Sequence, residues 1–473
     1  MGNKFYITTT LPYINAEPHI GFALEILEAD VLARFHREKG DDVFFNTGTD
    51  EHGLKVLRKA DELGLSALEY CDRQVQSFIK MEKFLNLSYD NFIRTTDVGH
   101  IVAAQEFWKK CDARGDIYKK IYKVKYCVGC ELEKTESELI DGKCPLHPNM
   151  EIEIIEEENY FFRFSNYQKK LLELYEKNPN FVLPNKRLNE IKRFVEGGLE
   201  DFSISRLKEK MPWGVEVPND SNHVMYVWFD ALVNYISALG WSAQEENFAQ
   251  WWPGTQLAGK DNLRQQAAMW QAMLMSADIE NSQQIFINGF IGVNGQKMSK
   301  SLGNVISPKE LVEKFGTDGA RYLLLGFGKF GEDMDVSMEK FTEKYNADLA
   351  NGLGNLVSRI IKMAEKMENY PEIVGSKIRA IEDIERFLGG LEIGQALGYI
   401  WKIIKEANKY IDENKPWELA KSNLAKFDEV MQKLLIDLGF IAELLVPMMP
   451  ETAEKIRESL KSRQTEILFQ RIK

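Results

Sequence analysis

Several features that define other classes of protein are scarce or absent in this chain of 473 residues. Cysteine occurs only five times, which argues against a small fold held together by disulfides. No run of about 18 apolar residues is present, so the sequence predicts no membrane-spanning helix. The first residues, Met1–Phe5, lack the apolar core and the cleavage site of a signal peptide. We therefore expect a cytoplasmic protein with no membrane contact.

Positive charge is in the minority. The 60 Lys and Arg residues face 72 Asp and Glu residues, and the net charge of −12 argues against a protein that coats nucleic acid by charge alone. The acidic excess lies in the first 345 residues, whereas the last quarter is nearly neutral. That last quarter can present a basic face, although a solvated helical bundle fits the same composition equally well.

The chain opens with the pattern of a strand, a helix and a second strand. Residues 5–10 are β-branched and aromatic, as in a buried strand. Apolar residues in 20–35 recur at steps of three and four, as on the buried face of a helix. Another apolar run starts at Val43. This order predicts a parallel sheet with helices on its faces.

Changes in pattern divide the chain further. Residues 118–222 combine alternating and acidic strands with three closely spaced cysteines, which indicates an insertion into the sheet domain. Near the C-terminus, apolar residues recur with a helical period. We therefore expect the first half of the sheet domain in 1–117, the insertion in 118–222, the second half in 223–320, a linking stem in 321–345 and a helical domain in 346–473.

The insertion carries two pairs of metal-binding residue types. Cys127 and Cys130 form a CxxC pair, and Cys144 and His147 form a CxxH pair. Each pair puts two ligands on one tight turn, and two pairs complete a tetrahedral zinc site without an open position. A buried thiol cluster without metal is the alternative. With four protein ligands the zinc would be structural, one ion per chain, and would stabilise an insertion that lacks a core of its own.

A first phosphate-binding candidate is the sequence PHIG, residues 18–21, at the expected start of the first helix. A helix N-terminus offers N–H groups and a positive dipole end to a phosphate. Gly21 allows a ligand to approach the backbone, and His19 adds a donor. Since a lone histidine at a helix start is more often structural, this motif is weak by itself.

A second candidate is the sequence GQKMSKSLGN, residues 295–304. Its lysines, Lys297 and Lys300, lie three positions apart between two glycines. Such a loop can close over a polyphosphate and neutralise charge that develops in a transition state. A solvated polar loop is the alternative.

Together these motifs resemble the paired HIGH and KMSKS signatures of the class I aminoacyl-tRNA synthetases. Other stretches resemble the methionyl-tRNA synthetase family in particular: TLPYINAEPHIG, NTGTDEHG, YVWFDALVNY, LAGKDN, VNGQKMSKSLGN, ADLANGLGNLVSR and ENKPWELA. The paired CxxC and CxxH turns match the zinc-bearing insertion of that family. The resemblance implies an α/β fold with a split Rossmann-type parallel sheet as the catalytic domain, a zinc-knuckle insertion and a C-terminal α-helical bundle that binds the anticodon.

The resemblance also implies a reaction and its partners. Methionine would be activated with ATP to methionyl-adenylate and transferred to tRNA(Met), for the initiation and elongation of translation. Mg²⁺ would accompany ATP, bound through its phosphates. We expect a monomer. By motif match the ATP-binding residues are Pro18, His19, Gly21, Glu25, Asp261, Lys297, Ser299 and Lys300, among which His19, Lys297 and Lys300 are the catalytic residues.

Two more sets of residues follow from the motif match. The expected methionine-binding residues are Leu11, Tyr13, Asp50, Trp228, Tyr235 and Gln266. Asp50 would face the ammonium group, and the aromatic rings would pack on the thioether sulfur, although an aromatic pair in a plain core is the alternative for Trp228 and Tyr235. The expected anticodon-binding residues are Asn355, Arg359 and Trp417, with an aromatic platform for one base and polar groups for its edge.

The sequence departs from the family pattern at three positions. Phe22 stands where the family motif usually ends in a second histidine, and a phenyl ring has no donor for a phosphate. Gln265 and Gln266 stand where the family usually has an aromatic residue and then a histidine. Either the methionine pocket is more polar here, or the alignment slips and Met269 or Trp270 supplies the wall.

Two other functions fit parts of the same sequence. The departures from the pattern would suit a tRNA-binding paralogue without catalytic activity, but the intact lysine loop and Asp50 argue against it. A class I synthetase for another apolar amino acid is the second alternative. Those enzymes usually carry a large editing insertion, and residues 118–222 are too few to hold one.

Overall fold

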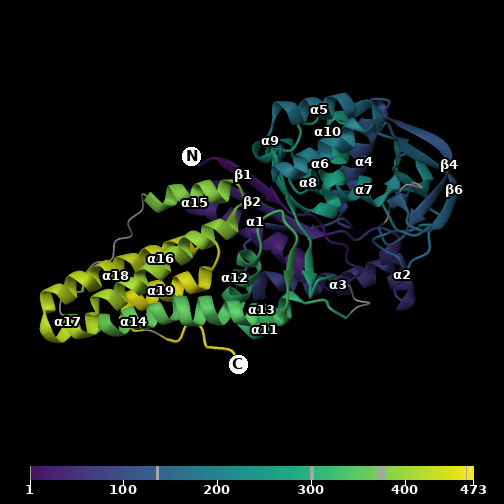
Figure 1. Ribbon diagram of the computed structural model, residues 1–473. Helices are drawn as coiled ribbons and strands as arrows, with labels where there is room; N and C mark the ends of the chain where they lie inside the picture. Colours follow the sequence, from purple (N-terminus) through teal and green to yellow (C-terminus); the bar gives the residue numbers. More distant parts are fainter. Residues whose placement is uncertain are drawn as a thin grey trace. The chain divides into compact units, whose positions relative to one another are not determined.

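The structure is a computed structural model that describes residues 2–130, 132–134, 138–298, 303–367, 370–371, 379–464 and 466–473 (Figure 1). The chain divides into two compact units. Unit 1 consists of residues 1–17, 42–80 and 89–287, and unit 2 consists of residues 18–41, 81–88 and 288–473. Within the described ranges, no helix is long and apolar enough to cross a membrane. The five segments expected from the sequence stay predictions.

A six-stranded sheet forms the centre of unit 1. Its strands, in spatial order, are β3 (Asn91–Arg94), β2 (Asp42–Thr49), β1 (Lys4–Thr8), β12 (Thr255–Gly259), β13 (Gln284–Asn288) and β7 (Val182–Leu183). The pairs β1–β2, β1–β12, β2–β3 and β13–β7 are parallel. Because β1 and β12 are neighbours despite their distance in sequence, the sheet is split by an insertion, which confirms the predicted fold class.

Helices and aromatic residues complete unit 1. Phe107 stacks on Trp270 with ring centroids 5.5 Å apart and meets Phe229 edge-on, and all three side chains are fully buried. The helices are α2 (Leu54–Glu62), α3 (Ala67–Leu85, which continues into unit 2), α4 (Val98–Ala113), α5 (Gln168–Lys177), α6 (Asn185–Glu196), α7 (Val227–Ala231), α8 (Asn234–Ser237), α9 (Glu245–Trp251) and α10 (Trp270–Ser276). Short turns are η2 (Phe164–Tyr167), η3 (Lys260–Asn262) and the π-helical η4 (Gln265–Met269).

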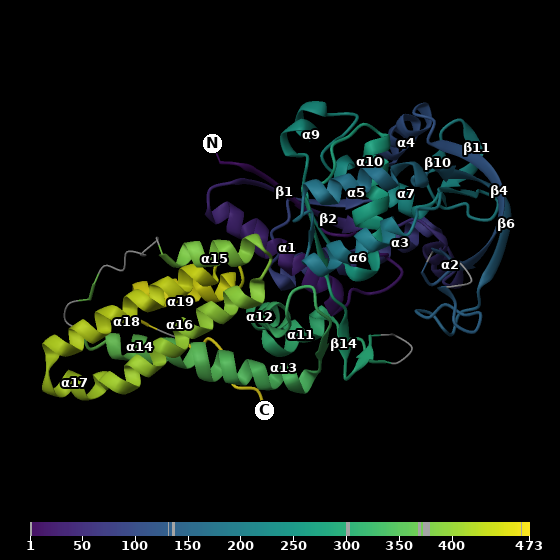
Figure 2. The same cartoon turned by 45° about the horizontal axis from the view of Figure 1, so that its top comes forward.

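A long antiparallel ribbon carries the predicted insertion (Figure 2). Strand β4 (Ile117–Cys127) pairs with β6 (Glu153–Phe162) from Ile117 opposite Phe162 to Tyr126 opposite Glu153. Strand β5 (Leu132–Lys134) extends the far end of β4, and β8 (Phe202–Ser203) pairs with β6. A second sheet contains β10 (Glu216–Val217), β11 (Asp220–Met225) and β9 (Ser205–Leu207). Cys127 ends β4, and the other three predicted metal ligands follow it, at the tip of this ribbon.

Unit 2 is mainly helical. Helices α14, α16, α18 and α19 pack side by side through apolar stripes, which confirms the predicted C-terminal bundle (Figures 1 and 2). The helices are α1 (Ile20–Glu38), α11 (Pro308–Phe315), α12 (Thr317–Phe327), α13 (Met338–Lys344), the π-helical η6 (Tyr345–Gly354), α14 (Asn355–Ala364), α15 (Arg379–Gly389), α16 (Ile393–Asn414), α17 (Pro416–Ser422), α18 (Leu424–Leu445) and α19 (Pro450–Ser462). Strands β15 (Gln296–Lys297), β14 (Ile291–Val293) and β16 (Met334–Val336) form a small sheet.

A fully buried arginine ties the parts of unit 2 together. Arg321, on α12, donates to Asp30 of α1 at 2.8 Å and to the carbonyl oxygens of Leu85, Pro447 and Met448 at 2.9, 3.1 and 2.8 Å. Burial by itself would raise the pKa of Asp30, but the Arg321 charge helps to hold that pKa below its ordinary value. The pair therefore stays ionised and fixes α1 against the C-terminal helices.

Candidate active site

The predicted first phosphate motif lies at the start of α1. His19 is the N-cap residue, and its Nδ1 accepts a hydrogen bond from the backbone N–H of Gly21 at 3.0 Å. With Nδ1 acting as acceptor, the proton of a neutral imidazole lies on Nε2, which then acts as a donor. Pro18 precedes the cap and is buried, whereas the His19 side chain is exposed. The histidine therefore has both the structural role of a cap and a donor beyond it.

The two predicted phosphate motifs meet at Gly21. A Cβ on Gly21 would lie 2.8 Å from His19 Cε1, so the His19 ring would have to move, and 3.9 Å from the Cε of Met298. Ile20 also donates from its backbone to the carbonyl of Ile306 at 3.2 Å, just beyond the lysine loop. Within unit 2, the helix start and the loop are therefore neighbours.

The remaining predicted ATP-binding residues are distributed over both units. Lys297 lies in β15, opposite Gly292. Ser299 and Lys300 lie outside the described residues. Glu25 is buried on α1, while Asp261 is exposed in η3, where its Oδ1 would lie 2.7 Å from a Cβ on Gly259.

Three of the predicted methionine-binding residues lie together in unit 1. Tyr13 and Asp50 form a parallel β-bridge: the Asp50 N–H donates to the carbonyl of Pro12 at 3.0 Å, and the Ile14 N–H donates to that of Asp50 at 3.1 Å. The Tyr13 ring meets Trp228 edge-on, with centroids 6.5 Å apart. Asp50 is only 3% exposed, so its carboxylate lies in a dry setting where an ammonium partner binds strongly.

The other predicted methionine-binding side chains are also in unit 1. Leu11 is half-buried. Tyr235 is buried on α8, and its hydroxyl donates to Oε1 of Gln266 at 2.9 Å. Within the described ranges, Nε2 of Gln266 and Oε1 of Gln265 are buried without a hydrogen-bond partner. The two glutamines therefore leave one donor and one acceptor unused. Burying such unpaired atoms lowers the stability of the fold.

A charged cluster in unit 1 was missed by the sequence reasoning. The Asp230 carboxylate lies between His52 Nδ1 at 2.6 Å and His100 Nε2 at 2.8 Å, and all three side chains are buried. Burial alone would raise the pKa of Asp230, but the two histidines outweigh it and hold that pKa at about 2. His52 and Asp230 each lie in a family-like stretch, yet 178 positions separate them, so no local pattern connects them.

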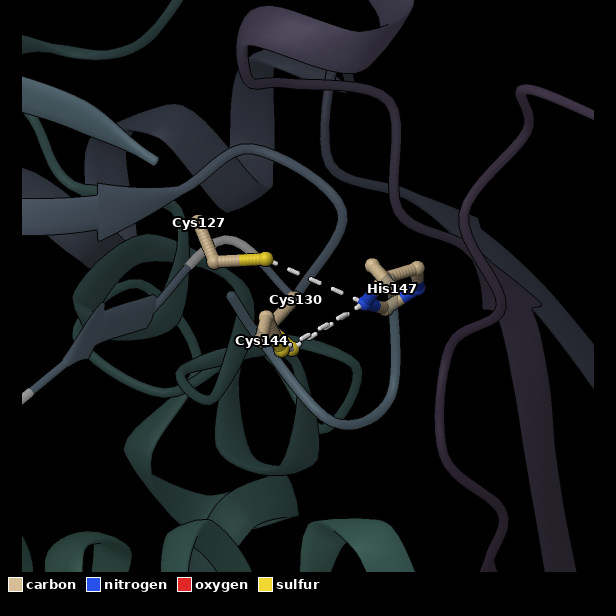
Figure 3. A group of neighbouring side chains, drawn as sticks. All are labelled: Cys127, Cys130, Cys144 and His147. Atoms are coloured by element: carbon tan, nitrogen blue, oxygen red, sulfur yellow. Dashed lines mark hydrogen bonds between the residues drawn. The ribbon is translucent and has the colours of Figure 1, made fainter. Parts of the chain in front are cut away.

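The four predicted metal ligands converge (Figure 3). Their ligand atoms all lie within 4.8 Å of one another. The Sγ of Cys130 lies 3.4 Å from that of Cys144 and 3.2 Å from His147 Nδ1, and Cys127 Sγ lies 3.9 Å from the same nitrogen. Zinc bonded to sulfur at about 2.3 Å would give tetrahedral edges of about 3.8 Å. Three thiols and one imidazole at this spacing therefore fit a zinc ion.

One glycine makes the metal-binding turn possible. A Cβ on Gly129, between the first two cysteines, would lie 2.4 Å from the His147 ring. Only a residue without a side chain allows the histidine to reach the cluster from the opposite turn. Val128 of the same turn packs with Tyr226 and Val227, and Trp228 lies against this group. The cluster is therefore joined to the part of unit 1 that carries the expected methionine-binding residues.

The predicted anticodon-binding residues lie near one end of the helical bundle in unit 2. Arg359 of α14 donates to Asp412 at 2.6 Å, and its guanidinium lies 5.9 Å from the ring centroid of Trp417. Trp417 is 41% exposed, which is unusual for so large an apolar ring. Asn355 is exposed and lines a hollow of about 330 Å³ together with Phe469. The structure thus brings Arg359 and Trp417 into contact.

Comparison with known proteins identifies the family. The family described as "tRNA synthetases class I (M)" matches residues 5–151 and 133–361. The methionine–tRNA ligase of Thermotoga maritima is 42% identical over 96% of this chain and 74% of that protein, and the one of Brucella suis is 42% identical over 97% and 92%. The Mycobacterium tuberculosis methionyl-tRNA synthetase, solved with methionyl-adenylate, superposes with a TM-score of 0.91, at 40% identity over 96% of this chain and 93% of that chain.

A split parallel sheet, neighbouring phosphate motifs and this similarity over nearly the whole length define a class I aminoacyl-tRNA synthetase. Within that class, the chain belongs to the methionyl-tRNA synthetases, and its activity is that of a methionine–tRNA ligase.

Proposed function

We propose that the enzyme activates L-methionine with ATP and transfers it to tRNA(Met), in the cytoplasm and as a monomer, for both initiation and elongation. In the first step the methionine carboxylate attacks the α-phosphate of ATP, and pyrophosphate leaves. In the second step the terminal ribose hydroxyl of the tRNA attacks the adenylate. No covalent enzyme intermediate is required, so the protein contributes alignment and charge neutralisation.

His19, Lys297 and Lys300 would stabilise the triphosphate. The cap bond from Gly21 to His19 Nδ1 supports this role, because it turns Nε2 into a donor. The lysines would neutralise the charge that develops as pyrophosphate leaves, with Ser299 on the same loop. Pro18 and Gly21 would shape the phosphate-binding turn, while Glu25 and Asp261 would contact the adenosine. Mg²⁺ bound to the ATP phosphates would supply further charge neutralisation.

Asp50 would bind the methionine ammonium group. Its burial and its backbone bridge to Tyr13 support this assignment, because they hold the residue in a dry setting beside Tyr13. Leu11, Tyr13, Trp228 and Tyr235 would enclose the side chain, because thioether sulfur packs well on aromatic rings. Gln266 would present its free amide N–H to the sulfur, a role supported by the absence of any partner at Nε2 in the described chain.

Two other elements complete the proposal. Zinc held by Cys127, Cys130, Cys144 and His147 would be structural, one ion per chain, because four protein ligands leave no open coordination position. The exposed ring of Trp417 would stack on an unpaired anticodon base, while Arg359 and Asn355 would read the edges of the bases. The contact between Arg359 and Trp417 supports a shared binding surface.

The grouping of Asp50 with Tyr13 and Trp228 carries the proposed substrate, and amino-acid-dependent exchange of pyrophosphate with ATP tests it. We expect exchange with methionine and not with leucine, isoleucine or valine. Exchange with another apolar amino acid in place of methionine would contradict the substrate. Binding of tRNA without exchange for any amino acid would favour the non-catalytic paralogue.

A further inference from the structure

The Asp230 cluster of unit 1 has no part in the function proposed above. Asp230 is fully buried, and each of its oxygens accepts from a different histidine. A buried carboxylate contributes little net stability compared with apolar packing, even when it is hydrogen-bonded, because its charge must leave water. The contribution of Asp230 to stability therefore does not explain the cluster, and the elements that Asp230 connects are the informative feature.

On one side, Asp230 closes a ring of contacts around the expected methionine-binding residues. Its Oδ2 binds His52 at 2.6 Å, and His52 lies two residues after Asp50. The backbone of Asp50 is bridged to Tyr13, and the Tyr13 ring meets Trp228. Trp228 lies on α7, two residues before Asp230, so the ring returns to its start.

The geometry of α7 explains how a hydrogen bond at Asp230 can orient Trp228 without direct contact. Successive residues of a helix are rotated by about 100°, so positions two apart project from nearly opposite faces. Trp228 is partly exposed on one face of α7, whereas Asp230 is fully buried on the other. A bond at Asp230 therefore fixes the rotation of α7 about its axis, and with it the direction of the indole ring.

On the other side, Asp230 holds α8 through His100. Oδ1 of Asp230 binds His100 Nε2 at 2.8 Å, and Nδ1 of the same ring lies 2.9 Å from the hydroxyl of Ser237. Ser237 lies on α8, as does Tyr235, whose hydroxyl donates to Gln266. One carboxylate is thus linked to the segments that carry Asp50, Trp228 and Tyr235.

We infer that Asp230 is a positioning residue of the amino acid pocket, which acts through His52 on Asp50 and through His100 on Tyr235. This inference deepens the proposed function and rests on the assignment of Asp50, Trp228 and Tyr235 to methionine. Asp230 does not touch the substrate. Its loss should therefore weaken methionine binding while the ATP-binding residues of α1 and the lysine loop keep their own geometry.

The first test is Asp230→Asn, which preserves size and removes the charge. The asparagine oxygen can accept from one histidine, but the amide nitrogen cannot accept from the other. In the exchange assay we expect the KM for methionine to rise by about tenfold or more and the KM for ATP to change by less than about twofold. A parallel titration of methionine by the tryptophan fluorescence of the free enzyme should give the same weakening.

A paired rescue separates positioning from a general loss of structure. In His52→Asn the amide nitrogen takes the place of Nδ1, whereas in His52→Leu no donor remains. Likewise His100→Gln places a donor at the position of Nε2, and His100→Leu does not. We expect the asparagine and glutamine variants to bind methionine more tightly than the leucine variants at similar melting temperatures.

The matched control is Asp116→Asn. Asp116 is also a buried carboxylate of unit 1. It accepts from Tyr167 at 2.5 Å and Ser276 at 2.8 Å, and neither of these is an expected methionine-binding residue. The Asp116→Asn substitution should lower the melting temperature without a selective change in the KM for methionine. Equal effects of Asp116→Asn and Asp230→Asn, or an absence of rescue, would overturn the inference.

Assays of the wild-type enzyme distinguish failure of the proposed function from failure of the inference about Asp230. Absence of methionine-dependent exchange in the wild type would overturn the proposed function and this inference together. Normal exchange in the wild type, with an unchanged KM for methionine in folded Asp230→Asn, would overturn the inference alone.

Discussion

Phe22, three residues after His19, is a buried ring in the first turn of α1 and is 9% exposed. It occupies the position where the family motif usually ends in a second histidine. Phe22→His would add a donor at the positive end of the helix, where negative charge is stabilised. We expect an adenylation rate equal to or above that of the wild type, measured by pyrophosphate exchange.

Phe22→Leu is the control, because it keeps an apolar side chain and adds no donor. It should retain a rate close to the wild type. A fall of about tenfold or more in Phe22→His, with Phe22→Leu still active, would show that apolar packing at this position is itself required.

Gln265 and Gln271 differ in how well their buried amides are satisfied. Oε1 of Gln265 has no partner within the described ranges, whereas Gln271 donates to Gln266 and Ser282 and accepts from Asn281. Because an unsatisfied buried group costs about 1–3 kcal/mol, Gln265→Met should raise the unfolding free energy by about 1 kcal/mol. Gln271→Met should lower it by a similar or larger amount.

Urea unfolding of the two variants and the wild type measures this difference. The paired design cancels the common effect of placing a methionine in this part of unit 1. Equal destabilisation by both substitutions would mean that Gln265 is satisfied in the folded protein.

At the scale of elements, the four ligands hold together the two metal-binding turns at the tip of the β4–β6 ribbon. Gly129 allows the contact between these turns. We expect about one zinc per chain in the wild type. Cys144→Ser, or treatment with a chelator, should remove the metal and open residues 127–147 to protease, because metal binding supplies the folding free energy of such turns.

Metal content by atomic spectroscopy and limited proteolysis measure these two effects. Cys111→Ala is the control, since Cys111 is buried in α4 and is not one of the four clustered ligands. It should keep its zinc and its resistance to protease between 127 and 147. Full zinc content in Cys144→Ser would contradict the assignment of that ligand.

At the scale of the whole molecule, one buried acid sets a pH dependence of stability. Burial raises the pKa of Glu28 on α1 to about 8 from 4.5, and the charge of Glu25 adds to this, while a hydrogen bond from Asn288 opposes it. The folded protein therefore keeps a proton that the unfolded chain loses above pH 4.5. The free energy of unfolding therefore falls as pH rises from 4.5 to 8. At pH 7 it is lower by about 3 kcal/mol than at a pH where Glu28 is protonated in both states.

Glu28→Gln should remove this dependence. We expect the variant to be more stable than the wild type at pH 7 to 8 and nearly equal to it at pH 5, by urea unfolding at each pH. Glu458→Gln, at an exposed position of α19, is the control and should leave the pH profile unchanged. An identical profile for Glu28→Gln and the wild type would show that Glu28 is already ionised in the folded protein.

Features that depend on residues close together in the chain could be predicted from the sequence. The order of strand, helix and strand, the CxxC and CxxH spacing and the helical period of the last quarter each involve neighbours in the chain, and the sheet, the ligand cluster and the bundle confirm them. The family-like stretches identified the class of enzyme for the same reason. The roles of the individual site residues stay predictions, because a motif match names residue types and not their contacts.

What the sequence determined by itself is therefore the fold class, the metal-binding residue set and the family. Only the tertiary structure decided which distant groups meet. Asp230 binds His52 across 178 positions, and Arg321 binds Asp30 across 291. The physical reason is that a buried charge needs a partner close in space, and no property of either residue's neighbours in the chain specifies which partner that is.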